Sequence, residues 1–224
     1  MRLLRLAAAA CLLAGAATAI PAFASPTSPQ AGVDYTVLAQ PQPVQAAGKK
    51  VEVIEFFMYH CPVCNGLEPG FEEWVKKQGD RIQVRRVHMP YTGANDPEAH
   101  LFLTLEALGK LDEMHGKVFD AVHKQHIRLN KDEAIIDWVS KNGIDRTSFL
   151  NAWNSFGVQT RMRQLGKLIE AYRIDSVPTL VIDGRFVTSP GLAHDSIKTN
   201  NPQEMFQATL QIADALVAKA AASK

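Results

Sequence analysis

Residues 55–64 read Glu55-Phe56-Phe57-Met58-Tyr59-His60-Cys61-Pro62-Val63-Cys64, an apolar segment that runs into a Cys-x-x-Cys pair. The apolar run Val51–Met58 predicts a central strand covered on both faces. Behind the pair, apolar residues recur at the spacing of an amphipathic helix: Cys64, Leu67, Phe71 and Trp74. Pro62 suits the first turn of this helix, and Pro69-Gly70 should kink or interrupt it. The segment therefore predicts two cysteines at the junction between a buried strand and a helix.

The rest of the chain supplies further strand and helix signals. They are a short strand near residues 35–38, a strand over 81–89, helices over 96–172, a hairpin over 178–188 with an Asp183-Gly184 turn, and a helix that opens at Asn201. This order predicts an α/β fold, thioredoxin-like with an inserted all-helical domain. We assign residues 25–91 and 166–224 to the two parts of the thioredoxin-like domain and residues 92–165 to the insertion.

The N-terminus has the pattern of a targeting segment. Two arginines precede the apolar run Leu6–Ile20, and Ala22-Phe23-Ala24 has the small-x-small pattern of a cleavage site. We therefore predict a secretory signal peptide over residues 1–24. The alternative is a lipoprotein site at Cys11, but the apolar segment before this cysteine is short for that purpose.

Composition limits the compartment and the partners. Removal of the signal peptide takes away two arginines, so the 24 basic and 23 acidic residues become 22 and 23, a net charge of about −1. This balance indicates neither a nucleic acid nor an anionic membrane as partner. The mature chain of about 200 residues can bury a core without disulfide staples. We expect a monomer exported to the oxidising periplasm of a Gram-negative bacterium.

The two mature cysteines favour dithiol chemistry. A sulfur at a helix N-terminus lies beside unpaired N–H groups and the positive end of the helix dipole, and both favour the thiolate. A second cysteine one turn later can resolve a mixed disulfide. We predict Cys61 as the exposed nucleophile and Cys64 as the buried resolving thiol.

Two other interpretations of the pair are weaker. A structural zinc site usually needs four ligands, and only His123-x-x-His126 offers loosely suitable spacing for two more, so we predict no metal. A purely structural disulfide between Cys61 and Cys64 would close so small a loop that it would restrict the unfolded chain very little.

The chain resembles the DsbA family of bacterial disulfide oxidoreductases over nearly all of its mature length. The resemblance is carried by five segments in a fixed order: Glu55-Phe56-Phe57, the Cys-Pro-x-Cys motif, Asn151–Phe156, Val177-Pro178 and Val181-Ile182-Asp183-Gly184. It implies a protein that donates a disulfide to reduced, unfolded exported proteins. It also implies reoxidation by a DsbB-like membrane partner that passes electrons to quinone, with no cofactor beyond the redox-active disulfide.

The resemblance also suggests how substrate is bound. Base rates favour a trans bond before Pro178, but similarity to the thioredoxin superfamily implies a cis bond that faces the disulfide. The Val177 backbone would then be free to pair with an extended substrate. Pro190 with Gly191 matches a turn near an apolar substrate groove, to which we also assign His60, Pro62 and Val63.

A charged pair is expected beneath the cysteines. Glu52 and Glu55 lie three residues apart on the central strand, so they point to opposite faces and we expect one to be buried. Arg86 shares a strand face with apolar residues and needs a carboxylate, for which Glu55 is the best candidate. The resemblance implies a role for Glu55 in proton transfer at Cys64; the alternative is a structural ion pair. Glu68 also matches a family acidic position, but we expect a solvated helix residue.

His60 and Val63 depart from the family pattern. Many relatives have histidine between the cysteines, so Val63 should raise the pKa of Cys61 and make the protein a weaker oxidant. His60 either compensates by placing an imidazolium near the Cys61 sulfur or lies exposed at the rim of the site. We expect the other histidines to be surface or helix-packing residues and Trp153 to be core.

Three functions remain open on the sequence. The first is a periplasmic thiol oxidase that forms a mixed disulfide at Cys61. The second is a reductase or isomerase, although isomerases usually dimerise through an added domain that this chain lacks. The third is a chaperone that binds peptides in the groove without catalysis.

Overall fold

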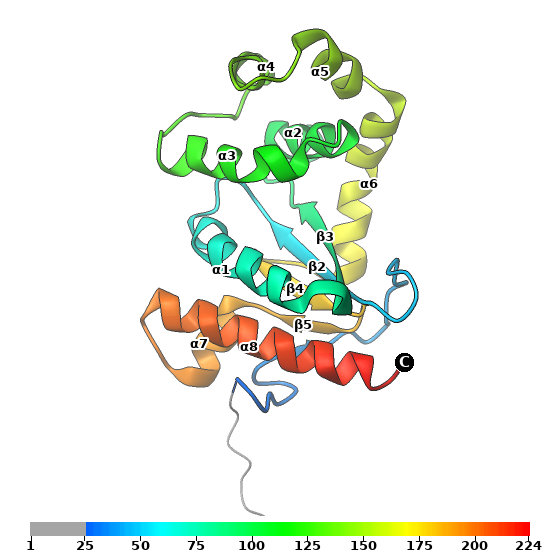
Figure 1. Ribbon diagram of the computed structural model, residues 1–224, viewed down its shortest axis with the longest axis vertical. Helices are drawn as coiled ribbons and strands as arrows, with labels where there is room; N and C mark the ends of the chain where they lie inside the picture. The colour runs from blue at the N-terminus through cyan, green and yellow to red at the C-terminus, as the bar shows by residue number, and fades with distance from the viewer. Residues whose placement is uncertain (1–25) are drawn as a thin grey trace, which may run out of the picture.

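The fold was analysed in a computed structural model that describes residues 26–224; the signal peptide expected at 1–24 lies outside the described residues. One mixed sheet organises the lower part of the molecule (Figure 1). Its strand order is β1-β5-β4-β2-β3, with β2 and β3 parallel and the other neighbours antiparallel. The strands are β1 (Thr36–Val37), β2 (Val51–Phe57), β3 (Ile82–His88), β4 (Thr179–Ile182) and β5 (Phe186–Thr188).

Helices cover both faces of this sheet. On one face lie α1 (Pro62–Gln78), α7 (Pro190–Ile197) and α8 (Pro202–Ala221), with a core that includes Val53, Phe71 and Leu216. On the other face lies α6 (Phe156–Tyr172), where Tyr172 contacts the ring of Phe56. Because β2 is buried on both sides, all seven of its residues are buried, as the apolar run predicted.

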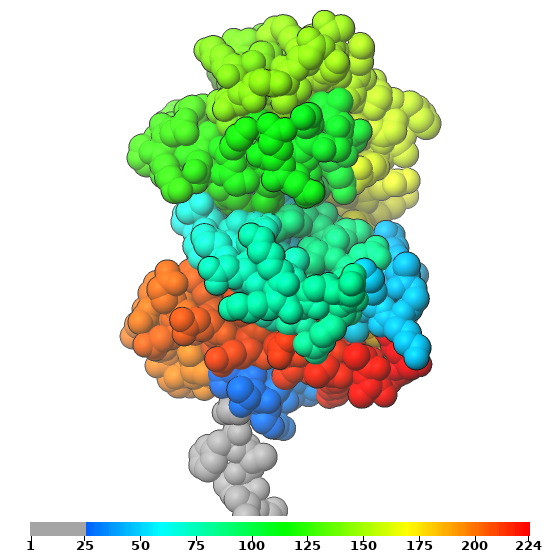
Figure 2. Space-filling view, viewed as in Figure 1, coloured from blue at the N-terminus to red at the C-terminus, as the bar shows by residue number. Residues whose placement is uncertain are grey.

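The helical insertion stacks above the carboxyl ends of β2 and β3 (Figure 1), and Figure 2 shows its green atoms as a layer above the cyan segment that includes α1. Its helices are α2 (Pro97–Ala107), α3 (Leu111–His123), α4 (Asp132–Lys141) and α5 (Arg146–Trp153). They share one hydrophobic core with the end of β2, and Phe57 contacts the rings of Phe102 and Phe119. The α/β fold with a helical insertion is confirmed.

The domain limits remain a prediction. Helix α6 continues without a break from the insertion to the sheet, so no linker marks the expected limit at 165/166. Among residues 26–224, none of the helices combines the length and apolar character needed to span a bilayer.

Local expectations mostly hold, with three corrections. Helix α1 continues through Pro69, so of the expected kink or interruption the interruption does not occur. Both Glu52 and Glu55 are buried, because each faces a covered side of the sheet and reaches an arginine on β3. Pro190 opens helix α7 rather than an isolated turn, since Ser189 caps this helix by accepting from Leu192 N–H.

The β4–β5 hairpin is confirmed by its turn. Asp183 and Gly184 both have positive φ, 54° and 62°, as a two-residue turn of the mirror-image type requires. A Cβ at position 184 would lie 2.3 Å from the carbonyl oxygen of Gln42, so glycine is needed there for space as well. Helix α8 begins as expected, with Asn201 accepting from Gln203 N–H.

Candidate active site

The two cysteines lie where β2 ends and α1 begins. Cys61 is the N-cap residue of α1, and its Sγ accepts a hydrogen bond from Cys64 N–H at 3.3 Å. Both thiols are free. Cys61 is 9% exposed and Cys64 is 1% exposed. Cys61 is therefore the more accessible of the two, as expected, but it is largely buried and not exposed as predicted.

The two thiols differ strongly in acidity. The pKa of Cys61 is lowered to about 6, first by a hydrogen bond from the Cys64 thiol, against burial, and further by the N–H groups of Cys64 and Val63 and the charge of His60. Burial raises the pKa of Cys64 far above that of a free thiol, and donation of its proton to Cys61 raises it further. One thiolate therefore belongs to the pair, and it resides on Cys61.

The peptide bond between Val177 and Pro178 is cis, as the resemblance implied. The Cys61 Sγ lies 3.7 Å from the Val177 carbonyl oxygen, so this loop borders the nucleophile directly. Val177 is half-buried and Pro178 is buried. Because proline lacks an N–H, Pro178 adds no backbone donor to this segment, and the backbone group that borders the Cys61 sulfur is the Val177 carbonyl.

The expected pair of Glu55 and Arg86 is confirmed and is part of a larger cluster. The two residues are direct partners in the β2–β3 register, and Arg86 Nε donates to Glu55 Oε2 at 3.0 Å. Arg86 Nη2 also donates to Glu68 Oε1 at 2.9 Å and to Glu72 Oε1 at 2.5 Å. The expectation for Glu68 was wrong: it is buried, because its position on α1 turns it toward β3 and not toward solvent.

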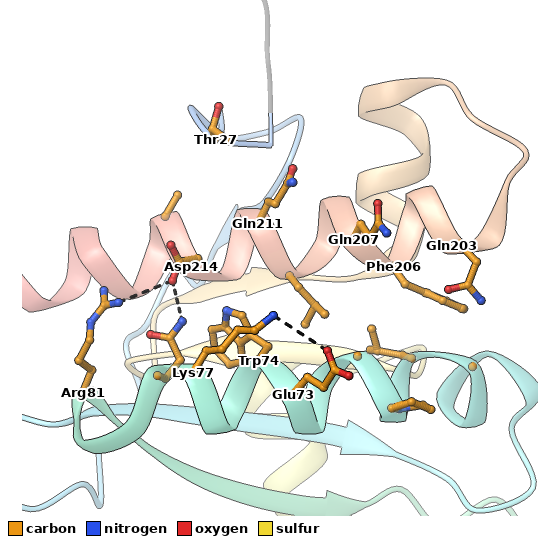
Figure 3. A pocket seen from close by; sticks show the side chains of 17 residues that line it. Thr27, Glu73, Trp74, Lys77, Arg81, Gln203, Phe206, Gln207, Gln211 and Asp214 are labelled. Carbon is orange, nitrogen blue, oxygen red and sulfur yellow. Dashed lines mark hydrogen bonds and ion pairs between the residues drawn. The ribbon is translucent and has the colours of Figure 1, made fainter.

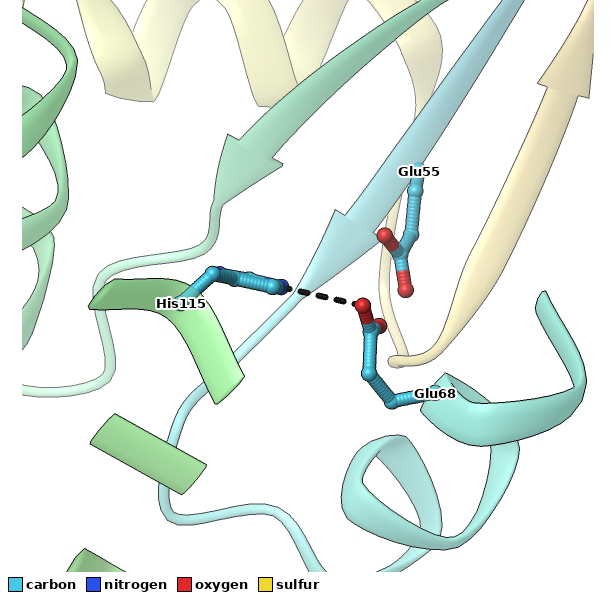
Figure 4. Close-up of side chains that lie close together, drawn as sticks. All are labelled: Glu55, Glu68 and His115. Carbon is cyan, nitrogen blue, oxygen red and sulfur yellow. Dashed lines mark ion pairs between the residues drawn. The ribbon is translucent and has the colours of Figure 1, made fainter. Parts of the chain in front are cut away.

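Figure 4 shows that Glu55, Glu68 and His115 converge from β2, α1 and α3. His115 Nε2 lies 3.3 Å from Glu68 Oε1, and its Nδ1 lies 3.0 Å from the Tyr59 hydroxyl. These three are the one group of possible metal ligands found within residues 26–224, with donor atoms within 4.8 Å of one another. The Arg86 guanidinium bonds to both carboxylates and would repel a cation, so the cluster does not suit a metal.

Glu55 is a buried acid that keeps its proton near neutral pH. Its pKa rises to about 8, chiefly through burial and then through repulsion from Glu68, and Arg86 only partly offsets both. Burial would also raise the pKa of Glu68, but the hydrogen bond from His115 and the charge of Arg86 together lower it. Near neutral pH Glu55 is therefore a carboxylic acid next to an ionised Glu68, and it is close enough to Cys64 for its charge to affect the pKa of that thiol.

His60 is held by the helical insertion. Its Nδ1 lies 2.6 Å from Glu98 Oε2 at the start of α2, and its ring packs edge-on against Tyr91. The hydrogen bond that His60 donates to Glu98 raises the pKa of His60, although burial opposes this. The His60 side chain is half-buried, as a residue at the rim of the site would be. Its positive charge also lowers the pKa of Cys61, as the compensating role would require.

Two further histidines border the site, although all histidines other than His60 were expected at the surface or in helix packing. His88 is buried at the end of β3 and its Nε2 accepts from Tyr59 N–H at 3.1 Å. His115 is buried in the charged cluster. The sequence contains a signal that could have placed His88 at the site, because His88 ends a strand parallel to β2 and shares a strand face with Arg86. His115 has none, because α3 meets the site only through tertiary packing.

The remaining expected site residues are placed as follows. Pro62 and Val63 are exposed beside Cys61, and Pro190 is buried at the start of α7. Trp153 is core, as expected, and stacks on His100 with ring centroids 3.5 Å apart.

Two clefts lie near the start and along the length of α1. The first, about 880 Å³, borders His60 and is lined by Tyr91, Glu98, Ile127 and Arg128 among others. The second lies between α1 and α8 and includes neither cysteine (Figure 3). Its polar wall carries Glu73, Lys77 and Asp214, with Asp214 accepting from Gln78 Nε2 at 2.6 Å.

A thioredoxin-type sheet with an acidic thiol at a helix N-terminus, next to a buried resolving thiol, defines a thiol:disulfide oxidoreductase. Comparison with known proteins identifies the family within this class. Residues 52–211 match the family described as DSBA-like thioredoxin domain, and the chain belongs to it.

Named relatives agree with this assignment. The thiol:disulfide interchange protein DsbA of Burkholderia cepacia is 43% identical over 169 residues, which are 75% of this chain and 80% of that protein. DsbA of Pseudomonas aeruginosa is 36% identical over 196 residues, 87% of this chain and 88% of that protein. Its crystal structure matches with a TM-score of 0.72 and covers 87% of this chain and 97% of that one. The oxidoreductase function of the Cys61–Cys64 pair follows.

Proposed function

We propose that this protein is a periplasmic dithiol oxidase that donates the Cys61–Cys64 disulfide to reduced, unfolded exported proteins. The observation that carries the proposal is the asymmetry of the two thiols, a stabilised thiolate at Cys61 and a buried thiol at Cys64. A stabilised Cys61 thiolate favours the reduced enzyme, so the disulfide is readily passed to other proteins.

The reaction begins when a client thiolate attacks Cys61 Sγ of the oxidised enzyme. The Cys61–Cys64 bond breaks, a bond forms between Cys61 and the client sulfur, and Cys64 leaves as a thiolate. Glu55, which is protonated near neutral pH, supplies the proton that Cys64 takes up. A second client thiolate then attacks the client sulfur of the mixed disulfide. Cys61 leaves as the thiolate, and two electrons have passed from client to enzyme.

The client is bound beside the cysteines as an extended chain. The backbone of Val177 lies next to Cys61 and is available for pairing, while Pro178 leaves this edge free of a further donor. We assign the surrounding contact surface to His60, Pro62 and Val63. Pro190 is buried at the start of α7, so we assign it a supporting role beneath this contact surface and no direct contact with the client.

Reoxidation is assigned to a membrane partner resembling DsbB, which transfers the electrons to quinone. The oxidase acts as a monomer and uses no metal or nucleotide, since the disulfide itself accepts and donates the electrons. The two other sequence hypotheses, a reductase or isomerase and a non-catalytic chaperone, are outcomes of the test below.

The test is a redox titration of the purified mature protein against glutathione, combined with oxidation of a reduced, unfolded protein that contains several cysteine pairs. We expect stoichiometric transfer of disulfides to the client and a reduction potential well above that of thioredoxin, about −270 mV. A potential as low as that value with no transfer would assign a reductase. Retention of full biological function by Cys61→Ser would assign a chaperone instead.

A further inference from the structure

Three carboxylates meet one guanidinium in the cluster beneath the cysteines. Arg86 contacts Glu55, Glu68 and Glu72, so the cluster has more acidic groups than its single cation can neutralise. Glu55 holds a proton that must come from solvent and return to it in every redox cycle. Glu55 itself has no exposed surface. A route between this carboxyl group and water is therefore needed.

Helix α1 provides the geometry of such a route. Cys64, Glu68 and Glu72 are spaced four residues apart, so they lie on one stripe of α1. The side-chain exposure rises along the acids of this cluster, from 0% at Glu55 through 9% at Glu68 to 42% at Glu72. The series leads from below the resolving thiol to the surface of the protein.

Each of the two buried acids has one oxygen available for a proton. Glu55 Oε2 and Glu68 Oε1 accept from Arg86, whereas Glu55 Oε1 and Glu68 Oε2 are buried without a hydrogen-bond partner. A buried oxygen without a partner is costly unless it carries or receives a proton during function. Arg86 fixes the carboxylates in place but cannot itself release a proton.

The side of the cluster formed by His115 and Tyr59 does not reach solvent. His115 on α3 lies beside Glu68 and also beside the Tyr59 hydroxyl, but the side chains of His115 and Tyr59 are both buried. The charged and titratable groups that face Glu72 are thus Glu68 on its own helix and Arg86 on β3, with Glu55 and His115 behind them. Among these, Glu72 has the most solvent contact.

We propose that Glu72 is the solvent end of a proton path that serves the resolving thiol Cys64 through Glu68 and Glu55. In reoxidation, Glu55 first releases its proton through Glu68 and Glu72 to water, because it holds one near neutral pH. The resulting Glu55 carboxylate then takes the Cys64 proton as the Cys64 sulfur attacks the mixed disulfide at Cys61. The Cys61–Cys64 bond forms, the bond from Cys61 to the partner sulfur breaks, and the partner leaves as a thiolate. Glu55 is then protonated again, and the net proton lost in this step is the one that passed through Glu68 and Glu72 to water. In client oxidation the same path runs inward. Glu72 is a positioning residue, since it acts on the sulfur only through Glu55.

This inference rests on the proposed role of Glu55, and the experiment isolates the step that needs a proton transfer. Reduced protein is mixed with oxidised glutathione, and the reaction is quenched at intervals and analysed by mass spectrometry. Formation of the glutathione adduct at Cys61 uses a thiolate that is already present. Loss of the adduct requires deprotonation of Cys64. The two rates therefore separate attack from proton transfer.

Glu72→Gln should keep the contact with Arg86 but cannot exchange protons. We expect adduct formation to be unchanged and adduct loss to slow by roughly tenfold to a hundredfold, less than the about 10²–10⁴ that a directly acting acid or base contributes. Glu73→Gln is the matched control, because Glu73 is the next residue but faces the α1–α8 cleft, where it pairs with Lys77 (Figure 3). It should match the unmodified protein in both rates.

Chemical rescue distinguishes proton transfer from a structural role. Glu72→Ala leaves space beside Arg86, and added acetate should accelerate adduct loss in this variant while leaving the unmodified protein unaffected. Equal adduct-loss rates in Glu72→Gln and the unmodified protein would overturn the proposal. So would a loss of rate that acetate does not restore and that accompanies a shifted reduction potential, since Glu72 would then act only through its charge. Either result could occur while the unmodified protein still oxidises its client, so the two proposals fail separately.

Discussion

Replacement of Glu55 by glutamine should change how the stability of the fold depends on pH. In the folded, reduced protein the pKa of Glu55 is about 8, against an ordinary value of 4.5 for a glutamate side chain. Between these two values the native state binds one proton more than the unfolded state at this site. The free energy of unfolding therefore falls as pH rises through this window, and it does not change further above it. Glutamine removes the titration, so the variant loses this component of the pH dependence.

The magnitude follows from the width of the window. Each pH unit between the two pKa values changes the free energy of unfolding by about 1.4 kcal/mol. From about pH 5 to about pH 7.5 the variant should gain on the unmodified protein by about 3 kcal/mol. The amide adds a buried donor with no partner near Glu55 Oε1, which costs about 1–3 kcal/mol at every pH. The slope with pH, and not the absolute difference, is thus the quantity to measure.

Urea unfolding followed by tryptophan fluorescence measures this slope. Both proteins are kept reduced by excess phosphine and unfolded at several values across about pH 5 to 7.5, with Glu73→Gln as the exposed control. We expect the curve of the Glu55→Gln variant to diverge from that of the unmodified protein as pH rises, while the control remains parallel to it. Parallel curves for all three proteins would mean that Glu55 is ionised in the fold, and the assignment of Glu55 as proton donor would be withdrawn.

Two further predictions concern the thiolate and the core. The thiolate absorbance of Cys61 should titrate with a midpoint near pH 6, and Glu98→Gln should raise this midpoint. The reason is that loss of the hydrogen bond to Glu98 lowers the pKa of His60 and removes a positive charge near the sulfur. An unchanged midpoint would show that His60 does not act on Cys61. Phe57→Ala should lower the free energy of unfolding by about 3–5 kcal/mol, because this fully buried ring packs β2 against α2 and α3, and Phe57→Leu should lower it less. Urea unfolding midpoints measure both losses, and equal losses in the two variants would contradict a cavity effect.

Several features of the site could be predicted from the sequence because they depend on short-range patterns. The apolar run before Cys61 required a central strand, and the spacing behind it required a helix whose first turn holds the cysteines. Arg86 on an apolar strand face required a carboxylate, and Glu55 was the nearest suitable one. The register that places these two residues opposite each other then follows from pairing β2 with β3.

The surroundings of Glu68 and His60 could not be obtained in this way. Helical spacing puts Glu68 on the same stripe as Cys64, but whether that stripe faces water or the core depends on where β3 and α3 pack. His60 precedes Cys61 in the chain, yet its partner Glu98 begins a helix 38 residues later. Sequence separation of this size leaves no periodic signal that links two residues.

The sequence by itself determined the order of strands and helices, the redox pair, and which of its two cysteines is the nucleophile. These follow from backbone periodicity and from the electrostatics of a helix N-terminus, which are local properties. Only the tertiary structure decided which charges share the buried space under Cys64. Burial by α1 and α3 makes Glu55 hold a proton, and the packing of the helical insertion places His115 and Glu98 beside the active-site segment. The acidity of a group depends on every charge and every desolvating surface around it, and those are brought together from distant parts of the chain.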